Sequence, residues 1–194
     1  VVLLTAVAAG LTITLLRARL TGRRLKPIKF ELDWLVFVAV IPQILVFQIP
    51  AIGKLVPEGL IPIILVISQA LLLGFTAANF YRPGVGLLGT GLLANFLAIV
   101  TNGGWMPISP ETVRRILPHL AADTPLLNRR LGISKDWIYA QEEIHLPWLA
   151  DRFTLPGWSP YQVAFSIGDV FIAIGIIWLL WSLSDPRNRR PNNA

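Results

Sequence analysis

The charged residues of this chain are segregated along the sequence. Six of its 17 Lys and Arg residues fall between Arg17 and Lys29, directly after a run, residues 1–16, that carries no charge. The other long apolar runs are equally bare apart from one carboxylate, Asp169. Uncharged apolar runs partition into lipid, and clusters of Lys and Arg stay at its cytoplasmic face. The pattern therefore predicts residence in a bilayer and an orientation within it.

Composition supports an integral membrane protein and excludes several kinds of chemistry. Hydrophobic residues make up 54% of the 194 residues and charged residues only 14%, whereas a soluble domain has about 25% charged residues. The net charge of +6 comes from basic residues that flank apolar runs, which indicates topology signals and contacts with anionic lipid rather than with nucleic acid. The absence of cysteine excludes disulfides, thiolate metal sites and cysteine nucleophiles.

The expected fold class is an all-α integral membrane protein with five transmembrane helices and a structured extracytoplasmic segment. A crossing needs about 20 apolar residues, and five stretches come close to that length: residues 1–16, 34–51, 60–80, 85–100 and 163–183. We expect a four-helix transmembrane region, an extracytoplasmic segment with short helices, a fifth transmembrane helix and a basic cytoplasmic tail; their boundaries are 1–100, 101–161, 162–184 and 185–194.

The distribution of Lys and Arg predicts the orientation. With the cluster from Arg17 to Lys29 in the cytoplasm, the N-terminus and the 101–161 segment lie outside, and the C-terminus lies inside. The expected location is the bacterial inner membrane. The residues expected to contact lipid headgroups and to fix this topology are Arg17, Arg19, Arg23, Arg24, Lys26 and Lys29.

Two stretches carry small residues at steps of four, a spacing that lets helices in lipid approach closely. We expect these faces to pack against a neighbouring helix, or against each other; they comprise Gly86, Thr90, Ala94 and Ala98 in one stretch and Ala70, Gly74 and Ala78 in the other. Uncharged amides in the apolar runs, such as Gln43, Gln69 and Asn95, are expected to form hydrogen bonds between helices.

The 101–161 segment is too long for a structureless loop and is predicted to contain short helices. Ser109 followed by Pro110 and Glu111 has the features of a helix start, so we expect a helix from Pro110 to about Leu117. A second helix is expected to begin at Ser134 and to end near His145.

Asp169 is the one acid inside an apolar run, and two interpretations of it stay open. An acid within the membrane is a functional candidate by default. However, Ser166 and Asp169 have the spacing of a capping box, which would place Asp169 in the first turn of the last helix, near the outer interface. There its charge also complements the helix dipole. We favour the cap.

The residues do not indicate a catalytic or metal-binding site. His119 and His145 are the only histidines, and both lie in the 101–161 segment, so haem or chlorophyll bound through histidine has no ligand in the apolar runs. Their spacing matches no compact zinc motif. Nucleophile-elbow, metalloprotease and phosphate-cradling glycine patterns are absent as well. We expect no catalytic residue, cofactor or metal.

Several stretches together resemble a family of bacterial multi-helix membrane proteins classed only as a domain of unknown function. They are Thr21–Leu25, Asn95–Ser109 (which contains Asn-Gly-Gly-Trp-Met-Pro), Leu146–Phe153 and Phe165–Val170 (Phe-Ser-Ile-Gly-Asp-Val). The resemblance covers nearly the whole chain and departs at Ala150, where glycine is expected. It implies a membrane fold and no established activity, cofactor or site residue.

The function expected from these observations is non-catalytic. The chain is predicted to be an accessory or scaffold subunit of a larger membrane complex, with a respiratory or photosynthetic assembly as a natural host. Its expected partners are membrane lipids and other membrane subunits. The alternative is a small transporter or lipid-binding protein with an intramembrane polar path formed by Gln43, Gln69, Asn95 and Asp169.

Overall fold

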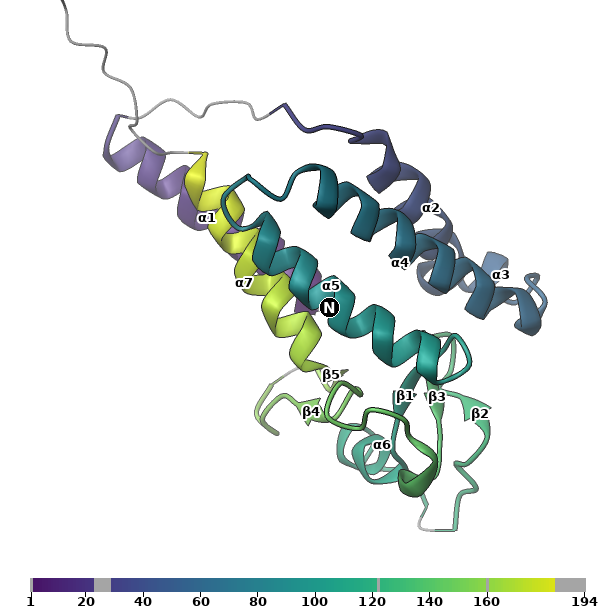
Figure 1. The fold of residues 1–194 in the computed structure, drawn as a ribbon. Coiled ribbons are helices and arrows are strands. Elements are labelled where there is room, and N and C mark those ends of the chain that lie inside the picture. The colour runs from purple at the N-terminus through teal and green to yellow at the C-terminus, as the bar shows by residue number, and fades with distance from the viewer. Residues whose placement is uncertain (1, 23–28, 122, 160, 184–194) are drawn as a thin grey trace, which may run out of the picture.

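The computed structural model describes residues 2–22, 29–121, 123–159 and 161–183 (Figure 1). The helices in these ranges are α1 (Val2–Leu20), α2 (Trp34–Gln48), α3 (Pro50–Gly53), α4 (Ile61–Ala78), α5 (Val85–Thr101), α6 (Pro110–Ile116) and α7 (Ile167–Ser182), with 3-10 turns η1 (Glu58–Leu60) and η2 (Gln141–Glu143). The strands are β1 (Met106–Ile108), β2 (Arg129–Arg130), β3 (Asp136–Ile138), β4 (Phe153–Thr154) and β5 (Ala164–Phe165). The predicted basic tail, 185–194, lies outside the described residues.

The long helices follow one another in a row rather than surrounding a common core (Figure 1). In the part of the chain that is described, the order of packing is α1, α7, α5, α4 and α2. α7 packs between α1 and α5, and α4 packs between α5 and α2. The first helix thus lies beside the last one, and α2 forms the opposite edge of the row.

The prediction of five transmembrane helices is wrong. Among the described residues, one helix is long and apolar enough to cross a membrane, namely α4 together with η1 (Glu58–Ala78). The apolar helices α2, α5 and α7 contain 15, 17 and 16 residues. At 1.5 Å per residue they are about 22–26 Å long, against a hydrocarbon core of about 30 Å.

Local signals inside the apolar runs shorten these helices. α2 ends at Gln48, because Pro50 disfavours the helical conformation of the residue before it, and that residue, Ile49, has an extended backbone (φ −110°, ψ 96°). α5 begins only after Gly84, whose φ of +80° suits glycine. α7 begins after Ser166, which caps it. A prediction that only counts apolar residues misses all three of these helix boundaries.

Residues 102–166, which we call the outer segment after the predicted location of the 101–161 segment, contain strands, so the all-α prediction is wrong as well. β3 pairs in parallel with β1 and antiparallel with β2, and β4 pairs with β5. The helix predicted from Ser134 to His145 is absent from this described stretch. Ser134 accepts a hydrogen bond from the N–H of Asp136 through its side chain, which forms a turn, and Trp137 then pairs with Pro107 across the sheet. The pairing partner lies 30 residues earlier in the chain, so local spacing did not indicate it.

The other predicted outer helix is confirmed. α6 runs from Pro110 to Ile116, and the Ser109 hydroxyl accepts the N–H of Thr112 at its start. Its buried face, which includes Val113 and Ile116, packs with Ile108, Leu126 and Ile138 in a small apolar core.

A second apolar cluster joins the outer segment to the helix row. Met106 and Leu149 from the outer segment pack against Leu65 of α4 and against Ala98 and Ile99 of α5. Because all five side chains are at most 4% exposed, burial of this cluster fixes the outer segment on the ends of α4 and α5.

Candidate functional site

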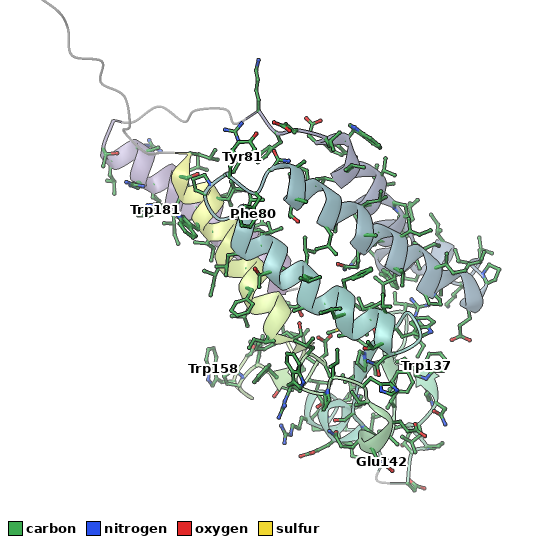
Figure 2. All side chains as sticks on the ribbon, in the orientation of Figure 1. Phe80, Tyr81, Trp137, Glu142, Trp158 and Trp181 are labelled. Carbon is green, nitrogen blue, oxygen red and sulfur yellow. The ribbon has the colours of Figure 1, made fainter. Side chains whose placement is uncertain are left out.

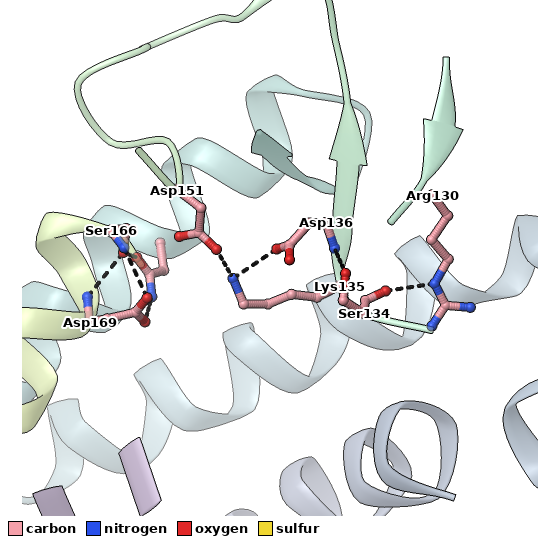
Figure 3. A network of polar contacts seen from close by, with 8 residues as sticks. Arg130, Ser134, Lys135, Asp136, Asp151, Ser166 and Asp169 are labelled. Carbon is pink, nitrogen blue, oxygen red and sulfur yellow. Dashed lines mark hydrogen bonds and ion pairs between the residues drawn. The ribbon is translucent and has the colours of Figure 1, made fainter. Parts of the chain in front are cut away.

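Buried and half-buried polar side chains gather where the outer segment meets α5 and α7 (Figure 3). They form two groups. The helix-end cluster consists of Asn95, Ser166 and Asp169, and the ion cluster consists of Lys135, Asp136 and Asp151. Burial makes hydrogen bonds and charge pairs count most here, because an unpaired polar group away from water is costly.

The helix-end cluster contains the predicted capping box. The Ser166 hydroxyl accepts the Asp169 N–H at 3.0 Å, and Asp169 Oδ2 accepts the Ser166 N–H at 3.0 Å. Asn95 of α5 connects this cap to the neighbouring helix. Its Nδ2 donates to Asp169 Oδ1 at 2.9 Å, and its Oδ1 accepts from the Ser166 hydroxyl at 2.8 Å. Both oxygens of Asp169 are therefore engaged, Oδ2 in the cap of α7 and Oδ1 in the bond that connects α7 to α5.

Glycines bring α5 and α7 close enough for these bonds. A Cβ added to Gly91 would lie 2.4 Å from the Gly168 carbonyl oxygen, and one added to Gly168 would lie 2.8 Å from the Gly91 carbonyl oxygen. Gly84 and Gly175 make the same kind of approach further along, with an added Cβ 2.3 Å from the Gly175 oxygen. No residue with a side chain fits at these positions without separating the two backbones.

The small-residue faces predicted on α4 and α5 do not meet each other. Ala98 is fully buried, but Gly86 lies against the ring of Phe80, and Gly74 lies near Leu35 of α2. The other predicted packing residues are exposed or half-buried: Ala70, Ala78, Thr90 and Ala94. The contact between α4 and α5 uses Gly89 instead, where an added Cβ would lie 3.1 Å from the Thr76 hydroxyl oxygen.

In the ion cluster, one ammonium lies between two carboxylates. Lys135 Nζ is 2.6 Å from Asp151 Oδ2 and 3.2 Å from Asp136 Oδ1. The Asp151 side chain is only 2% exposed and that of Lys135 is 32% exposed. The Asp151 N–H donates to the Pro107 carbonyl, so this acid also extends the edge of β1.

Charge and burial act against each other at this pair. Burial disfavours the ammonium of Lys135, yet the carboxylates of Asp136 and Asp151 outweigh it and raise the pKa of Lys135 above its usual value. Burial raises the pKa of the Asp151 carboxyl, and the Lys135 ammonium opposes that rise. The charged form of Asp151 therefore depends on Lys135.

A pocket of about 130 Å³ opens beside Asp151 and is lined also by Ser109 and Thr112 of the α6 cap. Asp151 Oδ1 is buried and has no hydrogen-bond partner within the described protein atoms. A polar pocket of this size has room for ordered water, which is the usual partner of such an oxygen.

Two buried asparagines anchor loops to the ends of helices. Asn102, the C-cap of α5, donates to the His145 carbonyl at 2.8 Å and accepts the His145 N–H at 2.9 Å. Asn79, the C-cap of α4 at the other end of the row, makes the same pair of bonds with the backbone of Glu31. Each amide replaces a strand partner and fixes the segment that it faces.

The predicted headgroup residues are only partly described. Arg17 lies over the ring of Trp181 at 4.0 Å, and the Lys29 carbonyl accepts a hydrogen bond from Arg82. Arg19 lies in the last turn of α1. Three further residues lie outside the described part of the chain: Arg23, Arg24 and Lys26.

The ion cluster and the bonds of Asn102 are not predictable from the sequence. Lys135 and Asp151 are 16 residues apart among several other charges, and no spacing rule pairs them before the sheet is known. In the described ranges there is no group of three or more His, Asp or Glu side chains that could hold a metal ion.

Comparison with known proteins gives one match. A family model described as a family of unknown function (DUF5317) matches residues 27–181. No curated protein matches, and no solved structure matches.

Proposed function

Because this chain belongs to DUF5317, a family of unknown function, no inherited activity guides its interpretation, and we propose that it is a non-catalytic membrane protein. In this proposal it serves as an accessory or scaffold subunit of a larger membrane assembly. Its location is the bacterial inner membrane, with the outer segment on the extracytoplasmic side. The observation that carries the proposal is the apolar surface that the helix row leaves uncovered.

A row of helices has two broad faces and no second layer in the described structure. Soluble domains bury such faces against another layer. Here large apolar side chains stay exposed along the row, among them Phe37 (64%) on α2, Ile67 (54%) on α4 and Leu93 (47%) on α5. A surface of this extent needs lipid or a protein partner.

The low burial of α4 also supports a membrane environment. Only 28% of its most apolar stretch is buried, whereas the core helix of a soluble protein is enclosed on most sides. Its position between α5 and α2 leaves the remaining surface apolar and uncovered. An environment of hydrocarbon accounts for this better than water.

The side of the helix row that carries the outer segment and the opposite side, where α1 ends and α5 begins, differ in charge. This difference supports the proposed orientation. Arg17 and Arg19 end α1, and Arg82 precedes α5, so these cations share the end opposite the outer segment. Basic residues accumulate on the cytoplasmic side of a membrane.

The buried polar groups support a structural role. Asp169 bonds to Asn95 and Ser166, and Lys135 is paired with two acids. A transport path through Gln43, Gln69, Asn95 and Asp169 is correspondingly less supported, since two of these four residues are bonded to each other.

Purification in a mild detergent tests the proposal. The full chain is expected to stay in the membrane fraction after alkaline carbonate washing and to co-purify with a second membrane protein in fixed stoichiometry. A photo-crosslinker at Phe37, on the edge helix α2, should capture that protein, whereas one at the outer-segment residue Glu142 serves as a control. Release by carbonate, or recovery only as a free monomer or homo-oligomer, contradicts the proposal.

A further inference from the structure

A groove lies at the basic end of the helix row, where α5 begins and α7 ends. Its volume is about 450 Å³, and we call it the basic-end groove; six of its lining residues are Phe80, Tyr81, Arg82, Trp178, Trp181 and Ser182. Figure 2 shows Phe80, Tyr81 and Trp181 together at this end of the molecule. The groove belongs to neither of the two clusters described above.

The walls of the groove are aromatic and exposed. Phe80 is 69% exposed, Tyr81 62% and Trp178 54%. Aromatic rings in such numbers are typical of the zone where lipid headgroups meet the acyl chains. The lining also includes the polar residues Arg82 and Ser182, so the groove is suited to a ligand with both an apolar and a polar part.

Arg82 supplies a cation with unused capacity. One terminal nitrogen of its guanidinium donates to the Lys29 carbonyl at 2.7 Å, and the group lies 4.9 Å from the Tyr81 ring centroid. Its Nε is buried and has no hydrogen-bond partner among the described atoms. A guanidinium has five N–H donors arranged to match a phosphate, and a buried donor without a partner is uncommon in a protein.

The surrounding backbone also favours an anion. α5 starts at the groove. The Val85 N–H donates to the Arg82 carbonyl, but the other first-turn N–H groups have no acceptor within the helix and carry the positive end of its dipole. The carbonyls that end α7 have the opposite polarity, but Arg17 donates to the Trp181 carbonyl and the Leu183 N–H caps this end.

Charge at this end is positive overall among the described residues. Two acids, Glu31 and Asp33, are outnumbered there by four basic residues, Arg17, Arg19, Lys29 and Arg82. Glu31 already accepts a hydrogen bond from Tyr81. An anionic ligand is therefore complementary to the groove, and a neutral one is not.

We propose that the basic-end groove binds an anionic phospholipid. The phosphate lies at Arg82 and the first turn of α5, and the acyl chains follow the rings of Phe80 and Trp178. The inference rests on the proposed membrane role, and it adds a specific lipid class at a specific place. A free phosphate ester shares the headgroup chemistry but leaves the aromatic walls without a ligand.

Native mass spectrometry of the full chain in neutral detergent tests the proposal, with phosphatidylglycerol and phosphatidylcholine added in equal amounts. We expect phosphatidylglycerol to be retained preferentially. Arg82→Gln should lower that preference about fivefold, as expected for one basic contact at a membrane surface, and Arg82→Lys should retain most of it. The matched control is Arg115→Gln in α6, an exposed arginine in the outer segment, and it should change nothing.

A second variant separates a lipid from a free anion. Ser182→Phe adds a bulky side chain to the groove and leaves Arg82 in the sequence, so it should reduce retention of phosphatidylglycerol, while excess glycerol phosphate should not displace the lipid. Because Arg82 also bonds to Lys29, circular dichroism checks the fold of each variant, and Ser182→Phe decides the question if Arg82→Gln unfolds.

Equal retention of the two lipids overturns the proposal, as does an unchanged preference in Arg82→Gln or in Ser182→Phe. Displacement by glycerol phosphate would identify a site for free phosphate esters instead. All of these measurements use the isolated chain. The absence of a co-purifying subunit therefore contradicts the proposed function and leaves the lipid result standing.

Discussion

The contact between α5 and α7 and the contact between α2 and α4 are built from different chemistry. α5 and α7 approach through Gly91 and Gly168 and are connected by the hydrogen bonds of Asn95. α2 and α4 meet through larger side chains, and buried Gln43 Nε2 and Gln69 Oε1 have no hydrogen-bond partner among the described atoms. Hydrogen bonds and close glycine packing fix the relative position of α5 and α7. The contact between α2 and α4 depends on packing of side chains, which constrains the relative position of the two helices less.

The largest expected effect comes from the ion cluster on the outer-segment side. Lys135→Met leaves the buried carboxylate of Asp151 without its partner, which should cost about 3 kcal/mol of unfolding free energy at pH 7. Burial raises the pKa of Asp151 and Lys135 opposes that rise, so without Lys135 the folded variant binds a proton at Asp151 more readily than the unfolded chain or the wild-type protein does. The loss of unfolding free energy in the variant, relative to the wild-type protein, should shrink as the pH falls toward about 4, the ordinary aspartate pKa.

Denaturant unfolding in detergent at pH 4.5 and pH 7 measures this dependence. Because the pKa of Lys135 is raised, the ammonium keeps its charge in the wild-type protein across that range and adds no dependence of its own. The double variant Lys135→Met/Asp151→Asn is the control and should be closer to the wild-type protein. An equal deficit at the two pH values contradicts this account.

The next effect compares one added methyl group at two helix contacts. Gly91→Ala places a Cβ 2.4 Å from the Gly168 carbonyl oxygen and should cost about 2–3 kcal/mol, as overpacking does. Gly74→Ala, at the contact of α4 with α2, meets only Leu35 Cδ1 at 3.8 Å and should stabilise the helix by about 0.5–1 kcal/mol. The unfolding temperatures of the Gly91→Ala and Gly74→Ala proteins test these two expectations. Equal changes in the two unfolding temperatures would contradict the distinction between the two contacts.

Replacing one amide in each contact sharpens the comparison further. Asn95→Leu removes the partner of the Ser166 hydroxyl and of Asp169 Oδ1, which should cost about 2 kcal/mol. Gln69→Leu removes a buried oxygen that has no partner and should be neutral or stabilising. The unfolding midpoints of the two variants should therefore move in different directions; a large loss in Gln69→Leu would show that this amide is bonded after all.

The smallest effect concerns the cap itself. Asp169→Asn keeps a side-chain oxygen and should cost about 1 kcal/mol, the usual value of an N-cap contact. Association with a partner subunit should be unchanged. Selective loss of that association in a well-folded Asp169→Asn protein, seen by co-purification, would restore the interpretation of Asp169 as a functional acid.

Local features of the fold could be predicted from the sequence. The caps at Ser109 and Ser166 are present because each serine hydroxyl and the backbone N–H that donates to it lie three residues apart. The family resemblance is confirmed as well. In these cases the information is contained in a few consecutive residues.

Features that depend on distant residues could not be predicted. The glycines that meet across α5 and α7, Gly91 and Gly168, do not lie in the run of small residues at steps of four, and their role appears only when the two helices are neighbours. β3 depends on a partner strand 30 residues earlier. The five predicted crossings failed because hydropathy counts apolar residues and ignores the extended Ile49 and the turn at Gly84.

The spatial order of the row has a consequence for how the chain assembles. α1 is synthesised before the other helices of the row, yet its neighbour α7 comes last. Until α7 is complete, α1 has no helix to pack against in the described row, and the pairing of the two closes a loop of nearly the whole chain. Such distant contacts form slowly, so α1 must be held by its surroundings while the helices between them assemble.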